Sequence, residues 1–238
     1  KDIINCINNK GSLLINGLLA VQKPHIAYSM YRDLNRQTIF ITNSDLEAKK
    51  VYDDLSFYMK DKVEYIGFQD ILFYHLDAKD RSEEAKRLKV LLKLAKGENI
   101  ILVTSIEAVM RKYIPKEILL ENIYTYKIGD VINLEKLSET LVNLGYERVS
   151  KIEGFGQFSI RGGIVDIFSL EYNNPIRMEL FDDEIDSIRT FDVFSQKSIE
   201  KINKFSITPS REFIYPENVE EAVDKIKKDT DKNTNEDV

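Results

Sequence analysis

Residues that build disulfides and metal centres are scarce in this sequence. Its 238 residues include one cysteine, Cys6, and two histidines, His25 and His75, which lie far apart. A single cysteine excludes an internal disulfide, and two separated histidines cannot supply the ligand cluster of a zinc or similar metal site. We therefore expect no metal site of these types in this chain.

Long apolar runs and a leader sequence are missing too. No run approaches the roughly 20 residues that cross a membrane, and no signal-peptide pattern opens the chain. Hydrophobic residues make up 43% and charged residues 31% of the sequence, as in ordinary soluble proteins. The sequence thus predicts a cytoplasmic protein of one or two domains with no membrane partner.

An excess of positive charge is also absent. Lys and Arg total 34 against 40 Asp and Glu, a formal net charge of −6, and the acidic residues are spread along the whole chain. Proteins that mainly grip phosphate backbones draw their affinity from clustered Lys and Arg. The balance therefore disfavours nucleic-acid binding as the main task and leaves a protein partner open.

No complete catalytic constellation is present. Ser105 has no glycine elbow and no obvious histidine partner, so nucleophilic catalysis has no support. The acidic groups at 182–184 and 82–84 fit a solvated turn and a helix start better than a metal or acid–base site. We predict no catalytic residue.

One stretch near the start, "LLINGLLAVQKPHIA" (13–27), resembles the opening of a nucleotide-binding unit: an apolar strand, a turn at Gly17, then a helix. A phosphate-cradling loop needs a second glycine and then Lys-Ser/Thr, whose hydroxyl holds magnesium. Lys23 fits this template, but Gln22 replaces the glycine and Pro24 the hydroxyl. The stretch is either a degenerate nucleotide-binding loop or was never one.

The first half of the chain alternates short β-type runs with amphipathic helical ones. "TIFIT" (38–42) precedes a helix that starts at Asp45, with Ser44 as its cap. "VEYIG" predicts the next strand, and a further helix is expected after Ser82. "NIILVT" (99–104) is apolar almost throughout, as in strands buried on both faces of a parallel sheet. This half is therefore predicted to be α/β.

The second half is predicted to be α+β and antiparallel. Asn133 can cap a helix whose leucine stripe ends before Gly145, and Gly162-Gly163 suits the turn of a β-hairpin. The expected divisions are an α/β lobe at 1–118, an α+β domain at 119–208, and a last segment at 209–238. That segment starts the next lobe with a polar helix from Pro216 and ends in a hydrophilic tail.

The strand "IRMELF" (176–181) carries the most informative pattern. Period-2 alternation puts its aliphatic residues on one face and Arg177, Glu179 and Phe181 on the other, with Arg161 nearby beside the glycine turn. Arginine beside an aromatic is typical of interface hot spots. The alternative is that Phe181 turns inward at the strand end and the charges only solubilise the sheet.

Four segments carry a resemblance to a known family: "GQFSIRGGIVDIF" (156–168), "IRMELFDDEIDSIRTFD" (176–192), "SQKS" (195–198) and "ITPSREF" (207–213). In order and spacing they resemble the N-terminal part of the bacterial transcription-repair coupling factors, the Mfd family. This family shares the module with the excision-repair protein UvrB. The resemblance covers most of the chain and is strongest from about 141 to 213.

The resemblance implies a role for each of these regions. It implies a helicase-like lobe whose phosphate loop, intact in UvrB, is degenerate at Gly17, Gln22, Lys23 and Pro24, so that the chain itself binds no nucleotide. It also implies that the α+β domain docks UvrA through positions matching Arg161, Arg177 and Phe181, with Glu179 between the last two.

UvrB also carries a long aromatic hairpin that clamps damaged DNA. The connection "FQDILFYHLDAKDRSEE" (68–84) is too short for such a hairpin, so Phe73 and Tyr74 are expected to be packing residues and not base-stacking ones.

Further properties are implied for the full-length family protein. It continues with an RNA-polymerase-binding domain and a motor that binds ATP and magnesium and acts on double-stranded DNA. Its C-terminal domain masks the UvrA-docking surface. The alternative reading is a nucleotide- or DNA-binding lobe closer to UvrB, in which Gly17 and Lys23 still hold phosphate.

Overall fold

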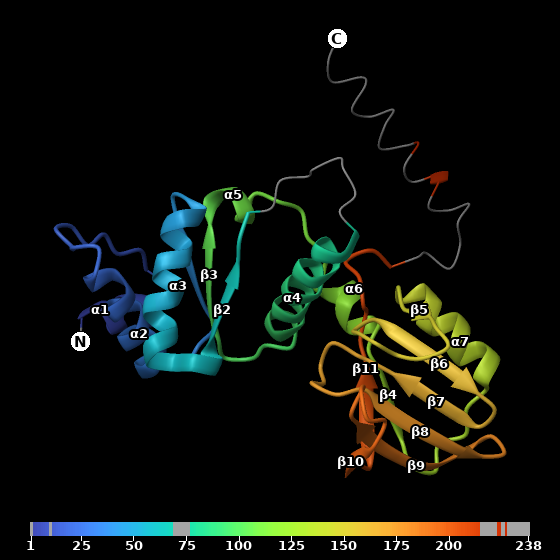
Figure 1. Cartoon of the computed structure of the whole chain (residues 1–238). Helices are drawn as coiled ribbons and strands as arrows, with labels where there is room; N and C mark the ends of the chain where they lie inside the picture. Colours follow the sequence, from blue (N-terminus) through green and yellow to red (C-terminus); the bar gives the residue numbers. More distant parts are fainter. Residues whose placement is uncertain (1, 10, 69–76, 215–222, 225–226, 228–238) are drawn as a thin grey trace. The chain divides into compact units, whose positions relative to one another are not determined.

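The computed structural model describes residues 2–9, 11–68, 77–214, 223–224 and 227. The chain divides into two compact units, Lys1–Lys116 and Glu117–Val238 (Figure 1). The division falls inside the short helix α6, Lys116–Glu121. Most of the expected helix from Pro216, the hydrophilic tail, Phe73 and Tyr74 lie outside the described residues.

Unit 1 is built on a parallel sheet of three strands in the order β1-β3-β2. β1 is Thr38–Thr42, β2 is Val63–Ile66 and β3 is Ile101–Ser105; β3 pairs in parallel with both neighbours and is buried at every position. The predicted apolar central strand is thus confirmed. Burial on both faces explains the apolar run Ile101–Val103, and the buried Thr104 hydroxyl donates to the Ile66 carbonyl.

Helices cover both faces of this sheet (Figure 1). α2 (Gln22–Leu34) and α3 (Asp45–Met59) pack on one face through a cluster that includes Tyr31, Ala48, Val51 and Leu55. α4 (Asp77–Ala95) covers the other face through Val90. The remaining elements of unit 1 are α1 (Asp2–Asn8), the 3-10 turn η1 (Lys60–Lys62) and α5 (Ile106–Val109).

The predicted cap of α3 is confirmed, because Ser44 Oγ accepts a hydrogen bond from the Glu47 N–H group. Two other expectations for unit 1 are wrong. The apolar strand before Gly17 does not form, since residues 11–21 contain no strand and Leu14 is exposed. α4 begins at Asp77, so the acidic group 82–84 lies inside the helix and not at its start.

Unit 2 contains a six-stranded sheet in the order β10-β9-β8-β7-β6-β5. Neighbouring strands are antiparallel except β5 and β6, which are parallel, so the expectation of a wholly antiparallel domain is wrong at this edge. The strands are β5 (Glu147–Arg148), β6 (Gln157–Arg161), β7 (Ile164–Ile167), β8 (Ile176–Phe181), β9 (Glu184–Phe191) and β10 (Ser198–Lys201).

Helix α7 (Leu134–Asn143) covers one face of this sheet, and its predicted cap is confirmed because Asn133 Oδ1 accepts from the Lys136 N–H group. Leu137 and Leu141 pack into a core with Val165 and Met178. A two-stranded ribbon of β4 (Tyr124–Lys127) and β11 (Lys204–Ile207) closes the same core through Phe205 and Ile207. The opposite face of the sheet does not contribute to this core.

The predicted hairpin between β6 and β7 is confirmed, since Arg161 pairs with Ile164 across Gly162-Gly163. Gly162 has a φ of +58°, which L side chains rarely adopt. A Cβ on Gly163 would come within 3.0 Å of the Leu180 carbonyl oxygen on β8. The two glycines therefore fix where Arg161 stands at the end of its strand.

Candidate functional site

Strand β8 separates an apolar face from a polar one. Ile176 and Met178 are buried in the core, whereas Arg177 and Glu179 lie on the opposite face. Phe181, at the end of the strand, is 81% exposed. The predicted alternation is confirmed, and the alternative in which Phe181 turns inward is wrong.

A β-bulge lies beside this strand without disturbing it. Glu179 pairs with Ser187 and Leu180 with Ile185, so the extra residue, Asp186, is on β9. The alternation of β8 therefore runs unbroken to Phe181, which shares the face of Arg177 and Glu179. We call this surface the open face; it comprises Arg161, Asp166, Arg177, Glu179, Phe181, Ser187 and Arg189.

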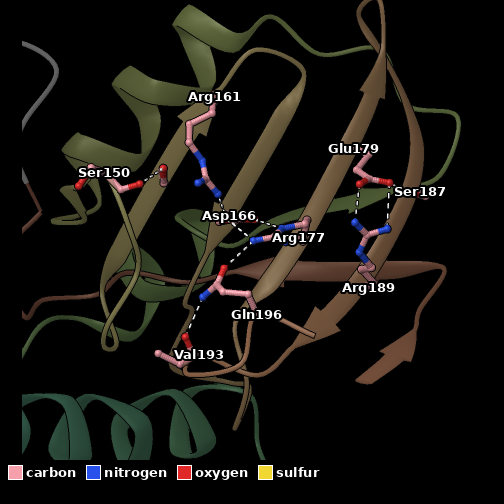
Figure 2. Close-up of polar contacts among 10 residues, drawn as sticks. Ser150, Arg161, Asp166, Arg177, Glu179, Ser187, Arg189, Val193 and Gln196 are labelled. Carbon is pink, nitrogen blue, oxygen red and sulfur yellow. Dashed lines mark hydrogen bonds and ion pairs between the residues drawn. The ribbon is translucent and has the colours of Figure 1, made fainter. Parts of the chain in front are cut away.

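A buried carboxylate organises two of the three arginines of the open face (Figure 2). Register places Asp166 of β7 opposite Arg177 of β8. Asp166 Oδ1 accepts from Arg177 Nε at 2.6 Å, and Oδ2 accepts from Arg177 Nη2 and from Arg161 Nη2, both at 2.8 Å. The Asp166 side chain is only 3% exposed. One carboxylate thus holds both guanidinium groups in fixed positions.

Arg177 is held from further directions. Its Nη2 also donates to Gln196 Oε1 at 3.0 Å, and its Cζ lies 4.3 Å from the centroid of the Phe191 ring. The hydrogen bond to Asp166 raises the pKa of Arg177, although burial acts in the opposite direction. The Nη1 group makes no hydrogen bond to the described residues, and the Arg177 side chain as a whole is 14% exposed.

Glu179 is balanced within the open face. Arg189 binds its carboxylate through both Nη groups, and Ser187 Oγ donates to it at 2.9 Å (Figure 2). Burial would raise the pKa of Glu179, but the bonds from Ser187 and Arg189 and the charges of Arg189 and Arg177 outweigh it, so this pKa is lowered. Glu179 therefore stays ionised and offers little charge to a partner.

Two side chains project from this network. Three arginines face two carboxylates, which leaves a formal surplus of one positive charge. Arg161 is the most exposed of these charged groups, at 53%, and Phe181 is the exposed aromatic. The open face can therefore offer a partner one preorganised cation and one apolar anchor.

The stretch compared with a phosphate loop is arranged differently. Gly17 has a φ of +80°, and α2 begins at Gln22. The N–H groups of Gln22 and Lys23 donate to the carbonyls of Leu19 and Ala20, at 3.0 and 3.3 Å. These are among the groups that would have to point at a phosphate.

The side chains of the same stretch are also engaged. Gln22 Oε1 accepts from the Leu19 N–H at 2.9 Å, and Lys23 Nζ lies 3.6 Å from Glu47 Oε1. Pro24 is buried and has no N–H group or hydroxyl. The turn satisfies its own polar groups and keeps few donors for an anion.

Other site types find no support in the described part of the chain. Within it, no three His, Cys, Asp or Glu side chains are grouped so that they could hold a metal ion. None of its helices is long and apolar enough to cross a membrane.

Three residues of the open face, Asp166, Ser187 and Arg189, were missed from the sequence, as was Gln196 of the loop that binds Arg177. The hairpin register gave a signal for Asp166, because counting back from Gly162-Gly163 pairs it with Ser159 on the face of Arg161. Arg189 and Gln196 gave none, since their roles depend on the bulge in β9 and on a loop conformation.

The chain is similar in sequence to known proteins. Residues 125–213 match a family model described as the UvrB interaction domain. The transcription-repair-coupling factor of Bacillus subtilis (strain 168) is 34% identical over 229 residues, which cover 95% of this chain and 20% of that protein.

Staphylococcal relatives give similar figures. The coupling factor of Staphylococcus aureus (strain Mu50) is 33% identical over 217 residues, covering 91% of this chain and 18% of that protein. That of Staphylococcus epidermidis (strain ATCC 12228) is 32% identical over 209 residues, covering 87% and 18%. The chain thus spans about a fifth of the length of these relatives.

Proposed function

Because the chain belongs by sequence to the transcription-repair-coupling factors, whose N-terminal region it matches, we propose that it is a docking module that recruits UvrA in transcription-coupled nucleotide excision repair. The match to a UvrB interaction domain covers all six strands of the unit 2 sheet. In this proposal the open face is the surface that UvrA contacts.

One observation carries the proposal: an 81% exposed phenylalanine shares the open face with an arginine pair fixed by a buried carboxylate. An exposed apolar side chain lowers the solubility of a monomer, and a fixed, partly buried arginine has lost part of its hydration. Both features favour binding, because preorganised groups lose little entropy when a partner docks. Arg161 and the free Nη1 group of Arg177 would donate to UvrA carboxylates, while Phe181 would fill an apolar recess.

The wider role belongs to the same proposal. As part of a longer protein, the module would bring UvrA to stalled RNA polymerase, with polymerase, double-stranded DNA, ATP and magnesium bound by regions beyond this chain. A C-terminal domain of that longer protein would cover the open face until it is needed.

Unit 1 is proposed to be a scaffold without nucleotide and the chain to have no enzymatic activity of its own. The hydrogen bonds of Gln22 and Lys23 within their own turn support this, as does the ion pair of Lys23 with Glu47. Mg-ATP titrated into the chain by calorimetry should give no heat of binding. Micromolar binding that is lost in Lys23→Ala would favour the alternative, a UvrB-like nucleotide-binding lobe.

The docking proposal is tested by calorimetric titration of UvrA with the wild-type chain, Phe181→Ala and Phe57→Ala. Phe57 is a matched control, because it is 83% exposed but lies on α3 of unit 1. We expect Phe181→Ala to lose roughly 2 kcal/mol of binding free energy and Phe57→Ala to bind like wild type. Absent wild-type binding, or equal effects of the two changes, would contradict the proposal.

A further inference from the structure

The loop between β9 and β10, residues 192–197, is braced by its own hydrogen bonds. Asp192 Oδ1 accepts from the N–H and the hydroxyl of Ser195, both at 2.7 Å. The Asp192 N–H donates to the Lys197 carbonyl at 2.9 Å, and the Gln196 N–H donates to the Asp192 carbonyl at 2.8 Å. The loop therefore has a defined conformation.

The same loop is tied to the open face through one side chain. Gln196 Oε1 accepts from Arg177 Nη2 at 3.0 Å, and Gln196 Nε2 donates to the Val193 carbonyl at 2.7 Å (Figure 2). Phe191, the last residue of β9, lies beneath the Arg177 guanidinium group. The position of the loop is thus fixed relative to Arg177.

At the tip of this braced loop stands Phe194, which is 90% exposed. Its neighbours in sequence, Val193 and Ser195, both take part in the bonds that hold the loop. The exposure of Phe194 is therefore not the result of a loosely held segment. The loop fixes the backbone from which the ring projects, and an aromatic with two side-chain torsions loses little entropy on binding.

We propose that Phe194 is a second apolar anchor for the partner of the open face, at the opposite end of β8 from Phe181. This inference rests on the proposed function and names UvrA as the occupant. Arg177, to which the loop is tied, and Phe181 are four positions apart on β8, which corresponds to about 13 Å along a strand. A partner surface of ordinary size, about 800 Å², reaches both ends of the strand.

The occupant must have a matching chemistry. Between the two phenylalanines lie Arg161 and the free Nη1 group of Arg177, with a surplus of one positive charge on the open face. The UvrA surface should therefore offer two apolar recesses with a carboxylate between them. Single exposed apolar residues are common, but Phe194 stands on a braced loop that is hydrogen-bonded to the proposed site.

The test is a calorimetric titration of UvrA with four forms of the chain: wild type, Phe194→Ala, Phe181→Ala and Phe57→Ala. Thermal midpoints are measured in parallel, and we expect all four forms to be equally folded because these rings are exposed. Phe194→Ala should raise the dissociation constant at least tenfold, whereas Phe57→Ala should leave it unchanged.

The outcomes separate this inference from the proposed function. If Phe181→Ala weakens binding and Phe194→Ala behaves like Phe57→Ala, the second anchor is refuted and the docking role stands. If the wild-type chain does not bind UvrA, the docking role fails and the anchor with it.

A fifth form, Asp192→Ala, keeps the Phe194 ring and removes the bonds from Ser195. We expect a several-fold loss of affinity from the loosened loop. Unchanged affinity in this form would refute the role of the bracing.

Discussion

Two regions of this chain contain basic residues that could meet an anionic group, and they use their hydrogen-bond donors in opposite ways. In the turn before α2, the N–H groups of Gln22 and Lys23 bond to carbonyls of the same turn, and the Lys23 ammonium group lies near Glu47. On the open face, Asp166 occupies some donors of Arg161 and Arg177 and leaves the others free.

The difference lies in how many fixed hydrogen-bond donors each region leaves unused. A basic residue and a glycine persist in the turn, but the groups around them are satisfied locally. On the open face, a buried acid holds Arg161 and Arg177 without using all of their donors, and Phe181, the aromatic residue of β8, is exposed on the same face. The number of unused, fixed donors separates the two regions better than the residue types.

The largest expected effect comes from removing the acid that organises the open face. Asp166→Ala would leave the largely buried Arg177 guanidinium group without its main partner, so we expect unfolding free energy to fall by about 3–5 kcal/mol. Chemical denaturation measures this. Glu200→Ala, which removes an exposed carboxylate from β10, is the control and should change stability by less than about 0.5 kcal/mol. Equal effects of the two changes would refute the organising role.

Arg177 and Arg161 should differ in how much each contributes to folding stability and to UvrA binding. Arg177→Ala removes hydrogen bonds to a buried carboxylate and should lower the unfolding free energy by about 2 kcal/mol. Arg161 is about half exposed, so Arg161→Ala should cost less than about 1 kcal/mol of stability while still weakening UvrA binding. Denaturation and calorimetry on both variants check this, and a larger stability loss in Arg161→Ala would reverse the assignment.

Low pH should lower the folding stability of the chain through protonation of Glu179. The folded-state pKa of Glu179 is lowered from 4.5, so its contribution to stability is present above about pH 4.5 and is lost as pH falls through the folded value. Thermal midpoints between pH 3 and 6 should therefore fall more steeply for the wild type than for Glu179→Gln. If the thermal midpoints of the two forms fell equally with pH, the bonds from Ser187 and Arg189 to Glu179 would contribute nothing to stability.

The smallest effect is expected in the turn before α2. The Lys23–Glu47 pair is exposed and 3.6 Å apart, so Lys23→Ala should change the unfolding free energy by less than about 0.5 kcal/mol. Denaturation again measures this. A loss of 2 kcal/mol or more would mean that Lys23 has a structural role that its contacts do not reveal.

Much of the fold could be predicted from the sequence where one local pattern determined it. The alternation of its residues predicts β8, the Asn133 cap predicts α7, and a largely apolar run predicts β3. The strand expected before Gly17 does not form. A strand needs a neighbouring strand to pair with, and an apolar run does not specify that neighbour. The parallel pairing of β5 with β6 was missed for the same reason.

The candidate site was predictable to a similar extent. Alternation along β8 and the glycine turn placed Arg161, Arg177, Glu179 and Phe181 on one face, where the structure brings them together. The bonds that hold them there join β7, β9 and the 192–197 loop. Such contacts depend on register and loop conformation, which residue spacing along one strand does not contain.

We propose that the open face, and not the turn before α2, is the surface that meets a partner. The most direct test titrates UvrA by calorimetry into the wild-type chain, Arg161→Ala and Lys23→Ala, which each remove one cation of similar exposure, 53% and 46%. We predict at least a tenfold rise in the dissociation constant for Arg161→Ala and none for Lys23→Ala. Equal affinities, or a loss confined to Lys23→Ala, would contradict the claim.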